Sequence, residues 1–446
     1  MQQKWGLKVE EFAKIKKAEI EISPFLVFIG ENNSGKSYLM TLLWGIYVLG
    51  RNIFFKEPPN VGVYKHCLEI IETAINDRVE EIELTKEHMQ KFLSFYNYVL
   101  DKNKNKLLKE LFSTDKIKIR KIEIINYERK KNLKIKFLYN KELQRVSSGK
   151  DYIKFPVSEI TKQEKYKIIQ YICWKLLMQD LNSSLFPYNY YDKKIDSEPL
   201  FLPASRTGFM LTYKALTSDV MNAWGVDSQI DTKFTLPVIK FLQALIRQKS
   251  SKNYPKEIIE FLENEILKGN IISKEKIVNE YSYKPKNLKN DIPLFITSSL
   301  VAELSPLVIF LKSNLRYKSI FIEELEAHLH PKIQKIITRA VIKLVNKKYP
   351  VVITTHSDVI FQHINNMIKL HYSKNKDELL KRLEYDEDDI INPYDIKVYE
   401  FKIVDYKTEV RLLKLTKEGF EVPSFNKALI ELANETMILS ESLGDV

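Results

Sequence analysis

Eight residues near the start of the chain read Gly30-Glu31-Asn32-Asn33-Ser34-Gly35-Lys36-Ser37. They fit the pattern G-x-x-x-x-G-K-[ST] in the context that the pattern requires. The apolar run 25–29 predicts a buried strand before it, and residues 39–47 carry apolar side chains at helical spacing after it. Glycines let such a loop curl tightly, so that backbone N–H groups and the start of the helix surround a phosphate. All eight residues are therefore predicted to line a nucleotide site.

Two side chains of this loop are predicted to have separate tasks. Lys36 can contact the β- and γ-phosphate oxygens of ATP, and the Ser37 hydroxyl can bind Mg²⁺. The sequence thus predicts ATP and Mg²⁺ as cofactors.

Two later apolar stretches also end in polar side chains. Residues 319–322 are followed by Glu323 and Glu324, and residues 349–355 are followed by His356. In phosphoryl transfer one carboxylate can hold Mg²⁺ while the next polarises the attacking water, and a histidine can bond a γ-phosphate oxygen. Alone, paired glutamates more often begin a solvated helix and a histidine more often caps one. The phosphate loop favours the catalytic alternative.

Composition bounds the class of protein. The chain has 446 residues, 44% hydrophobic and 29% charged, which is typical of a globular protein of two or three domain-sized units. Two cysteines are too few for a disulfide framework, so a cytoplasmic location is expected. The start lacks a secretion signal, and the longest apolar run, 38–49, is shorter than the ~20 residues that cross a bilayer. We therefore expect a soluble protein with no membrane partner.

Strand and helix patterns alternate along the chain, which favours an α/β fold. Residues 1–50 are expected to form the first half of a nucleotide-binding unit and 51–195 an inserted, mostly helical lid. Residues 196–446 would supply the remainder, with two C-terminal strands and a helix from about residue 425.

The positive charge is concentrated in one segment of the insertion. Residues 101–150 contain 16 Lys and Arg but only 6 Asp and Glu, although the whole chain has a net charge of +12. Residues 116–122 and 133–138 alternate with period two and predict a basic hairpin over 115–140. Its cationic face could bind nucleic acid or an acidic protein; the alternative is a solvated edge that lysines protect from aggregation.

The order of these motifs resembles one family. The phosphate loop, Ser298-Ser299 before a helix, IFIEELEAHLHP at 320–331 and ITTHSD at 353–358 resemble the ABC-type ATPase heads of the RecF, SMC and OLD group. The resemblance is greatest to the stand-alone ATPases of bacterial anti-phage systems, such as PtuA of Septu and AriA of PARIS. It implies a mainly parallel central sheet, an antiparallel lobe of N-terminal strands and a head-to-head dimer or higher oligomer. It does not extend to residues 50–195.

The resemblance also implies roles for individual residues. Glu323 corresponds to the Walker B acid, Glu324 to the catalytic base and His356 to the switch histidine. Residues 203–206 resemble the Pro-Ala-x-Arg strand end of the group, which would place Arg206 near the nucleotide or a partner; a structural salt bridge is an equal alternative. Ser298 and Ser299 would contact the γ-phosphate held by a second subunit, although the same stretch is also a plain serine-capped helix.

Two positions depart from the family pattern. The Walker B acid is commonly Asp, and Glu323 is one methylene longer, so its contact to Mg²⁺ could run through water. Leu300 stands where the signature motif usually has glycine. Glycine would let the backbone approach the phosphate, whereas leucine carries a Cβ. Rapid turnover is therefore open to question. His328 and His330 suggest a metal site by their spacing, but a loop is the preferred interpretation.

Three functions fit these observations. The first is an ATPase sensor or scaffold that controls a separate nuclease or toxin in anti-phage defence. The second is a RecF-like repair ATPase that binds DNA through residues 101–150, and the third is an ATP-gated binding module with little hydrolysis. A nuclease within this chain is disfavoured, because the acidic run 386–389 lacks the expected preceding strand and suggests a solvated loop.

Overall fold

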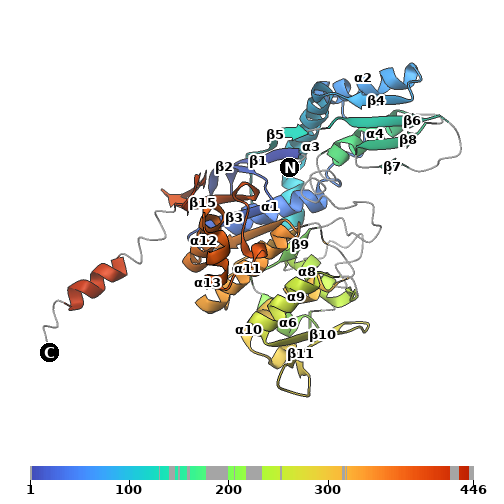
Figure 1. Ribbon diagram of the computed structural model, residues 1–446. Coiled ribbons are helices and arrows are strands. Elements are labelled where there is room, and N and C mark those ends of the chain that lie inside the picture. Colours follow the sequence, from blue (N-terminus) through green and yellow to red (C-terminus); the bar gives the residue numbers. More distant parts are fainter. Residues whose placement is uncertain are drawn as a thin grey trace.

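A computed structural model gives the fold (Figure 1). It describes residues 3–129, 131–139, 146–148, 151–157, 161–176, 199–204, 206–216, 234–251, 254–313, 317, 319–421 and 431–440. None of the described helices combines the length and the apolar character needed to cross a membrane.

A nine-stranded sheet runs through the centre of the molecule (Figure 1). Its order is β5-β1-β2-β16-β15-β3-β14-β13-β9. The five strands from β15 to β9 are all parallel, whereas β5, β1 and β2 pair antiparallel to one another and β16 pairs antiparallel to β15. This is the predicted α/β fold with a mainly parallel sheet and an antiparallel N-terminal lobe. The strands are β1 Gln3–Phe12, β2 Ile15–Glu21, β3 Phe25–Gly30, β5 Lys121–Arg129, β9 Leu200–Leu202, β13 Ile320–Ile322, β14 Val351–Thr355, β15 Ile396–Val404 and β16 Lys407–Leu412.

Strand β3 is buried on both sides, as its uninterrupted apolar sequence predicts. Its alternate side chains enter two different hydrophobic cores, Leu26 and Phe28 on one face of the sheet and Phe25, Val27 and Ile29 on the other. The first core also contains helices α1 Lys36–Leu49, α2 Gly62–Asn76, α3 Lys86–Phe112 and α4 Lys162–Trp174. The second contains α6 Arg206–Thr212, α8 Leu236–Arg247, α9 Lys256–Phe261, α10 Ser299–Leu311, α11 Pro331–Asn346, α12 Asp358–Tyr372 and part of α13 Lys376–Leu383.

The predicted basic hairpin is wrong, although strands form close to both expected positions. Strand β5 pairs with β1 in the central sheet. Strand β6 instead pairs with β4 and β8 in a separate four-stranded sheet. The pattern of alternation located the strands but could not identify their partners, because both strands offer an apolar face to the same core. The strands of this sheet are β4 Glu81–Leu84, β6 Leu133–Leu138, β7 Ser147–Ser148 and β8 Tyr152–Pro156.

The remaining elements are two small sheets and several short helices. A small sheet β10-β11-β12 precedes α10, and the pair β17-β18 follows β16. The predicted C-terminal strands are confirmed by β15 and β16, and residues 431–440 are helical, whereas residues 422–430 lie outside the described part of the chain. The bounds are η2 Leu262–Leu267, a π-helix, β10 Gly269–Lys274, β11 Glu280–Pro285, β12 Ile292–Pro293, η3 Leu294–Ile296, η4 Glu387–Asp389, η5 Pro393–Asp395, β17 Leu415–Thr416 and β18 Gly419–Phe420.

Candidate functional site

The predicted site residues lie where the parallel strands end. In the register of the sheet, Ile29 at the end of β3 pairs with Thr355 of β14, and Ile353 pairs with Ile322 of β13. The phosphate loop, His356 and the two glutamates therefore leave the same edge of the sheet. Such edges, beyond the carboxyl ends of parallel strands, are where ligands bind in open α/β sheets.

The loop has the backbone conformation that a phosphate cradle requires. Gly30, Asn33 and Gly35 have positive φ angles of 137°, 61° and 94°. A side chain at Gly30 would place its Cβ 2.3 Å from the carbonyl oxygen of Phe401, so glycine is needed there. Helix α1 begins at Lys36 directly after Gly35, and its first N–H groups remain without helical partners. Amides and helix start together form an anion site.

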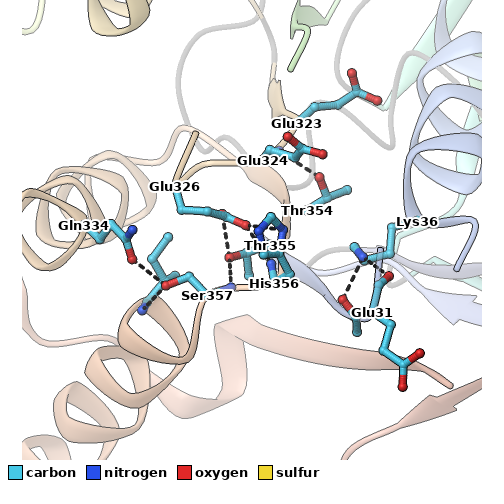
Figure 2. A network of polar contacts seen from close by, with 12 residues as sticks. Glu31, Lys36, Glu323, Glu324, Glu326, Gln334, Thr354, Thr355, His356 and Ser357 are labelled. Atoms are coloured by element: carbon cyan, nitrogen blue, oxygen red, sulfur yellow. Dashed lines mark hydrogen bonds and ion pairs between the residues drawn. The ribbon is translucent and has the colours of Figure 1, made fainter. Parts of the chain in front are cut away.

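Lys36 is a buried cation, and among the described residues no carboxylate forms an ion pair with it. Its side chain is 7% exposed, and Nζ donates to the carbonyl oxygens of Gly30 at 2.8 Å and Glu31 at 2.7 Å. Burial lowers the pKa of the ammonium, and the more distant charges of Glu326 and Glu324 oppose this effect. Figure 2 shows the Glu31 carboxylate turned away from the group. Because neutral carbonyls only partly compensate a buried charge, an anion can take their place.

Glu323 lies beside the loop. Its carboxylate accepts a hydrogen bond from the backbone N–H of Ala204 at 3.2 Å. Burial raises the pKa of Glu323, although this bond and the nearby hydroxyl of Ser37 favour the charged form. The structure thus brings together the two predicted Mg²⁺ ligands. A hydroxyl and a carboxylate are the oxygen donors that Mg²⁺ takes from proteins alongside phosphates, so these residues fit the ion.

The backbone of Glu324 is held in an unfavourable conformation. Its φ angle is 44°, in the left-handed region that costs about 1–2 kcal/mol for a residue with a Cβ. Two side chains fix it: the Thr354 hydroxyl accepts the N–H of Glu324 at 2.9 Å, and Arg206 donates to its carbonyl oxygen at 3.2 Å. Strain of this kind persists only where the surroundings impose it, and it is concentrated at functional sites.

His356 is held by a carboxylate that the sequence analysis did not identify. Glu326 is 6% exposed; its Oε1 accepts the backbone N–H of His356 at 2.7 Å and lies 2.9 Å from His356 Nδ1, and its Oε2 accepts the Thr355 hydroxyl at 2.7 Å (Figure 2). Although burial opposes ionisation of Glu326, the bonds from His356 and Thr355 lower its pKa. The bond to Glu326 raises the pKa of His356, so that its charged form is favoured. The position of Glu326 three residues after Glu323 was the available signal.

The pair predicts a pH-dependent stability that Glu326→Gln removes. The lowered pKa of Glu326 stabilises the fold at pH values above the ordinary pKa of about 4.5, and the raised pKa of His356 stabilises it until the pH rises past the pKa of the folded state. Between these two pH limits, the free energy of unfolding of the wild type should exceed that of the variant by about 1 kcal/mol. The amount is modest because the imidazole is 42% exposed. Urea unfolding at pH 4, 6 and 9 measures it; a difference equal at all three pH values would contradict the pairing.

Arg206 contacts the end of strand β13 and helix α10. It is 2% exposed, donates to the carbonyl oxygen of Glu323 at 2.6 Å and forms an ion pair with the buried Glu303 of α10. Burial lowers the pKa of the guanidinium, and Glu303 opposes this. The ion pair with Glu303 is the salt bridge that the second alternative predicts.

Ser298 and Ser299 begin α10 at the surface. Both are exposed, and neither hydroxyl caps the helix, so the plain capping interpretation lacks its hydrogen bond. In the described part of the chain no hydrogen bond joins them to the phosphate loop. Leu300 is partly buried and packs on the second core. Its side chain therefore points away from the exposed start of the helix.

The other candidate sites have structural explanations. His330 caps α11, with Nδ1 accepting the N–H of Lys332 at 3.3 Å, and among the described residues no group of three or more His, Cys, Asp or Glu could hold a metal. The acidic run is solvated only in part: Asp386 and Glu387 are exposed as expected, whereas Asp389 is fully buried and pairs with Arg339 of α11. A solvated loop was the expectation because sequence alone does not show the cations of another helix.

Part of the basic segment is neutralised by nearby acids. Lys134 and Lys136 of β6 share one carboxylate, that of Glu81 of β4, at 2.8 Å and 2.7 Å, and together they lower the pKa of Glu81 to about 2. Arg120 pairs with Glu10 of β1. For these cations the contacts favour the solvated-edge alternative, whereas Lys116 and Lys118 are exposed. Residues 130, 140–145 and 149–150 of the segment lie outside the described residues.

Comparison with known proteins shows the family to which the chain belongs. A family model described as the AAA ATPase domain matches residues 6–361, and no curated protein matches. Among solved structures the chain is similar to an Smc head bound to the C-winged helix domain of ScpA, with 13% identity over 92% of this chain and 98% of that one, and a TM-score of 0.36. It is also similar to the SMC head domain of Thermotoga maritima (10%, 93% and 100%, TM-score 0.34) and to an Smc head with an extended coiled coil, bound to the C-terminal domain of ScpA, from Pyrococcus furiosus (13%, 97% and 98%, TM-score 0.31). Since the family model spans most of the chain, this protein belongs to the AAA ATPase domain family.

Proposed function

We propose that the protein binds ATP with Mg²⁺ and hydrolyses it between two copies of the chain, and that this assembly controls a separate effector in anti-phage defence. Membership of the ATPase family supports the first part. The nature of the effector, a nuclease or toxin, rests on the resemblance of the motifs alone.

One observation carries the ATP-binding proposal. Lys36 is a buried ammonium that is solvated only by neutral oxygens, at the start of a helix and next to backbone amides in a nest-like conformation. Every one of these groups favours negative charge at the same place. A triphosphate satisfies them together, and among the described residues no carboxylate forms an ion pair with Lys36.

The remaining residues supply the chemistry. Ser37 and Glu323 would hold Mg²⁺, which neutralises charge on the phosphates. The Glu324 carboxylate, on a backbone fixed by Thr354, would orient and deprotonate the attacking water. Protonated His356 would donate a hydrogen bond to the γ-phosphate, which ATP has and ADP lacks.

A dimer is proposed because of where the two serines of the signature-like motif lie. Ser298 and Ser299 are exposed at the positive end of α10 and separate from the loop of their own chain. They can therefore meet the γ-phosphate held by a second copy. Leu300 does not prevent this, since its side chain packs on the core.

Nucleotide-driven assembly tests this proposal. Mass photometry of the Glu324→Gln variant should show monomers without nucleotide and dimers or a larger oligomer with Mg²⁺ and ATP. Replacing both serines with glutamate adds negative charge opposite the γ-phosphate and should prevent the change while ATP binding persists. Assembly that does not depend on ATP, or that persists in the Ser298→Glu/Ser299→Glu variant, would contradict the shared site.

Co-expression with the product of the neighbouring reading frame tests the effector proposal. An ATP-dependent complex is expected, and the absence of a complex both with and without ATP would contradict the proposal.

A further inference from the structure

Arg206 and Glu303 connect two parts of the site that are distant in sequence. Arg206 follows β9, and its guanidinium reaches the carbonyl oxygens of Glu323 and Glu324 at 2.6 Å and 3.2 Å. The same guanidinium forms an ion pair with Glu303. Glu303 belongs to α10, one helical turn after Ser299.

The connection is rigid because Glu303 has little freedom to move. Its side chain is fully buried, and Oε2 accepts the backbone N–H and the hydroxyl of Thr207 at 3.1 Å and 2.7 Å. If a buried carboxylate loses such partners, its negative charge is compensated neither by them nor by water, which is unfavourable. A displacement of α10 is therefore expected to move Arg206 with it.

The other end of the connection is a strained backbone position. The backbone of Glu324 has a φ of 44°; the Thr354 hydroxyl accepts its N–H, and its carbonyl accepts from Arg206 at 3.2 Å and from the backbone N–H of Ala327 at 2.9 Å. If Arg206 shifts, the carbonyl loses the bond that links it to α10 and keeps the local bond from Ala327. The backbone of Glu324 is therefore sensitive to where α10 places Glu303.

We propose that the Arg206–Glu303 pair transmits the contact made at Ser298 and Ser299 to Glu324 of the same chain. A serine contact with the partner's nucleotide then aligns the catalytic carboxylate of the other site, so that the two sites of a dimer act together. Arg206 and Glu303 are positioning residues in this scheme. The proposal rests on the shared-site dimer proposed above.

The test separates ATP binding, assembly and turnover in Glu303→Gln. The variant keeps the shape of the side chain but loses its charge. We expect ATP affinity within about twofold of wild type and retained ATP-driven assembly, but at least a tenfold lower kcat and a Hill coefficient for ATP that falls to one. Thr207→Val removes only one donor to Glu303, so its kcat and Hill coefficient should lie between those of wild type and Glu303→Gln.

A matched control distinguishes positioning from general destabilisation. Asp389 is likewise fully buried and holds Arg339 through two hydrogen bonds of 2.9 Å and 2.7 Å, away from the strand ends. Asp389→Asn should lower the melting temperature without the loss of kcat. Equal kcat losses in Asp389→Asn and Glu303→Gln, or an unchanged kcat and Hill coefficient in both Glu303→Gln and Thr207→Val, would overturn the proposal. If wild type itself neither assembled nor hydrolysed ATP, the proposed function would fail, and this inference with it.

Discussion

Lys36→Ala should greatly weaken ATP binding without destabilising the protein. The ammonium is the one buried charge of the loop, and truncating one partner of a buried charge pair costs about 2–5 kcal/mol, or roughly 30- to 4,000-fold in affinity. Without nucleotide, however, this charge is paired only with carbonyl oxygens, so its removal relieves a desolvation cost. Equilibrium dialysis with radiolabelled ATP and thermal unfolding measure the two effects.

A second lysine serves as the control for this experiment. Lys343 of α11 is also buried, but it pairs with Asp386 and Asp389. Lys343→Ala should therefore lower stability and leave ATP affinity unchanged, the reverse of Lys36→Ala. Unchanged ATP affinity in Lys36→Ala would show that the loop does not hold the phosphates.

Glu324→Gln should abolish turnover while ATP still binds. Gln has the same shape and leaves the backbone bonds to Thr354 and Arg206 in place, but it cannot accept a proton from water. General-base catalysis typically contributes 10²- to 10⁴-fold, so kcat should fall by about that factor. Release of radiolabelled phosphate measures it, with ATP affinity determined on the same samples. Equal, negligible rates in wild type and variant, with binding intact, would instead favour an ATP-gated module that hydrolyses little.

The strand ends were predictable because each is specified by a short, continuous stretch of sequence. An apolar run followed by glycines or acids specifies both a buried strand and the chemistry at its end, and parallel strands bring such ends to one edge. The proximity of Ser37 to Glu323, nearly 300 positions apart, is what this rule predicts. For the same reason β3, β13 and β14 lie at the expected positions.

What the sequence did not reveal depends on partners supplied from elsewhere in the chain. Glu326 is one acid among several in its segment, and only the packing of β14 shows that it holds His356. Arg206 was expected near the nucleotide or in a salt bridge, and its partner Glu303 lies about a hundred residues away. The pairing of β5 with β1 instead of β6 was equally hidden, because register and partner are decided by the whole sheet.

The most direct test is the structure of the protein with Mg²⁺ and a non-hydrolysable ATP analogue. The account predicts that Lys36 Nζ leaves the carbonyls of Gly30 and Glu31 for phosphate oxygens, that the metal lies between Ser37 and Glu323, and that the γ-phosphate faces Glu324 and His356. An analogue bound elsewhere, or Lys36 still bonded to the two carbonyls in the complex, would contradict it.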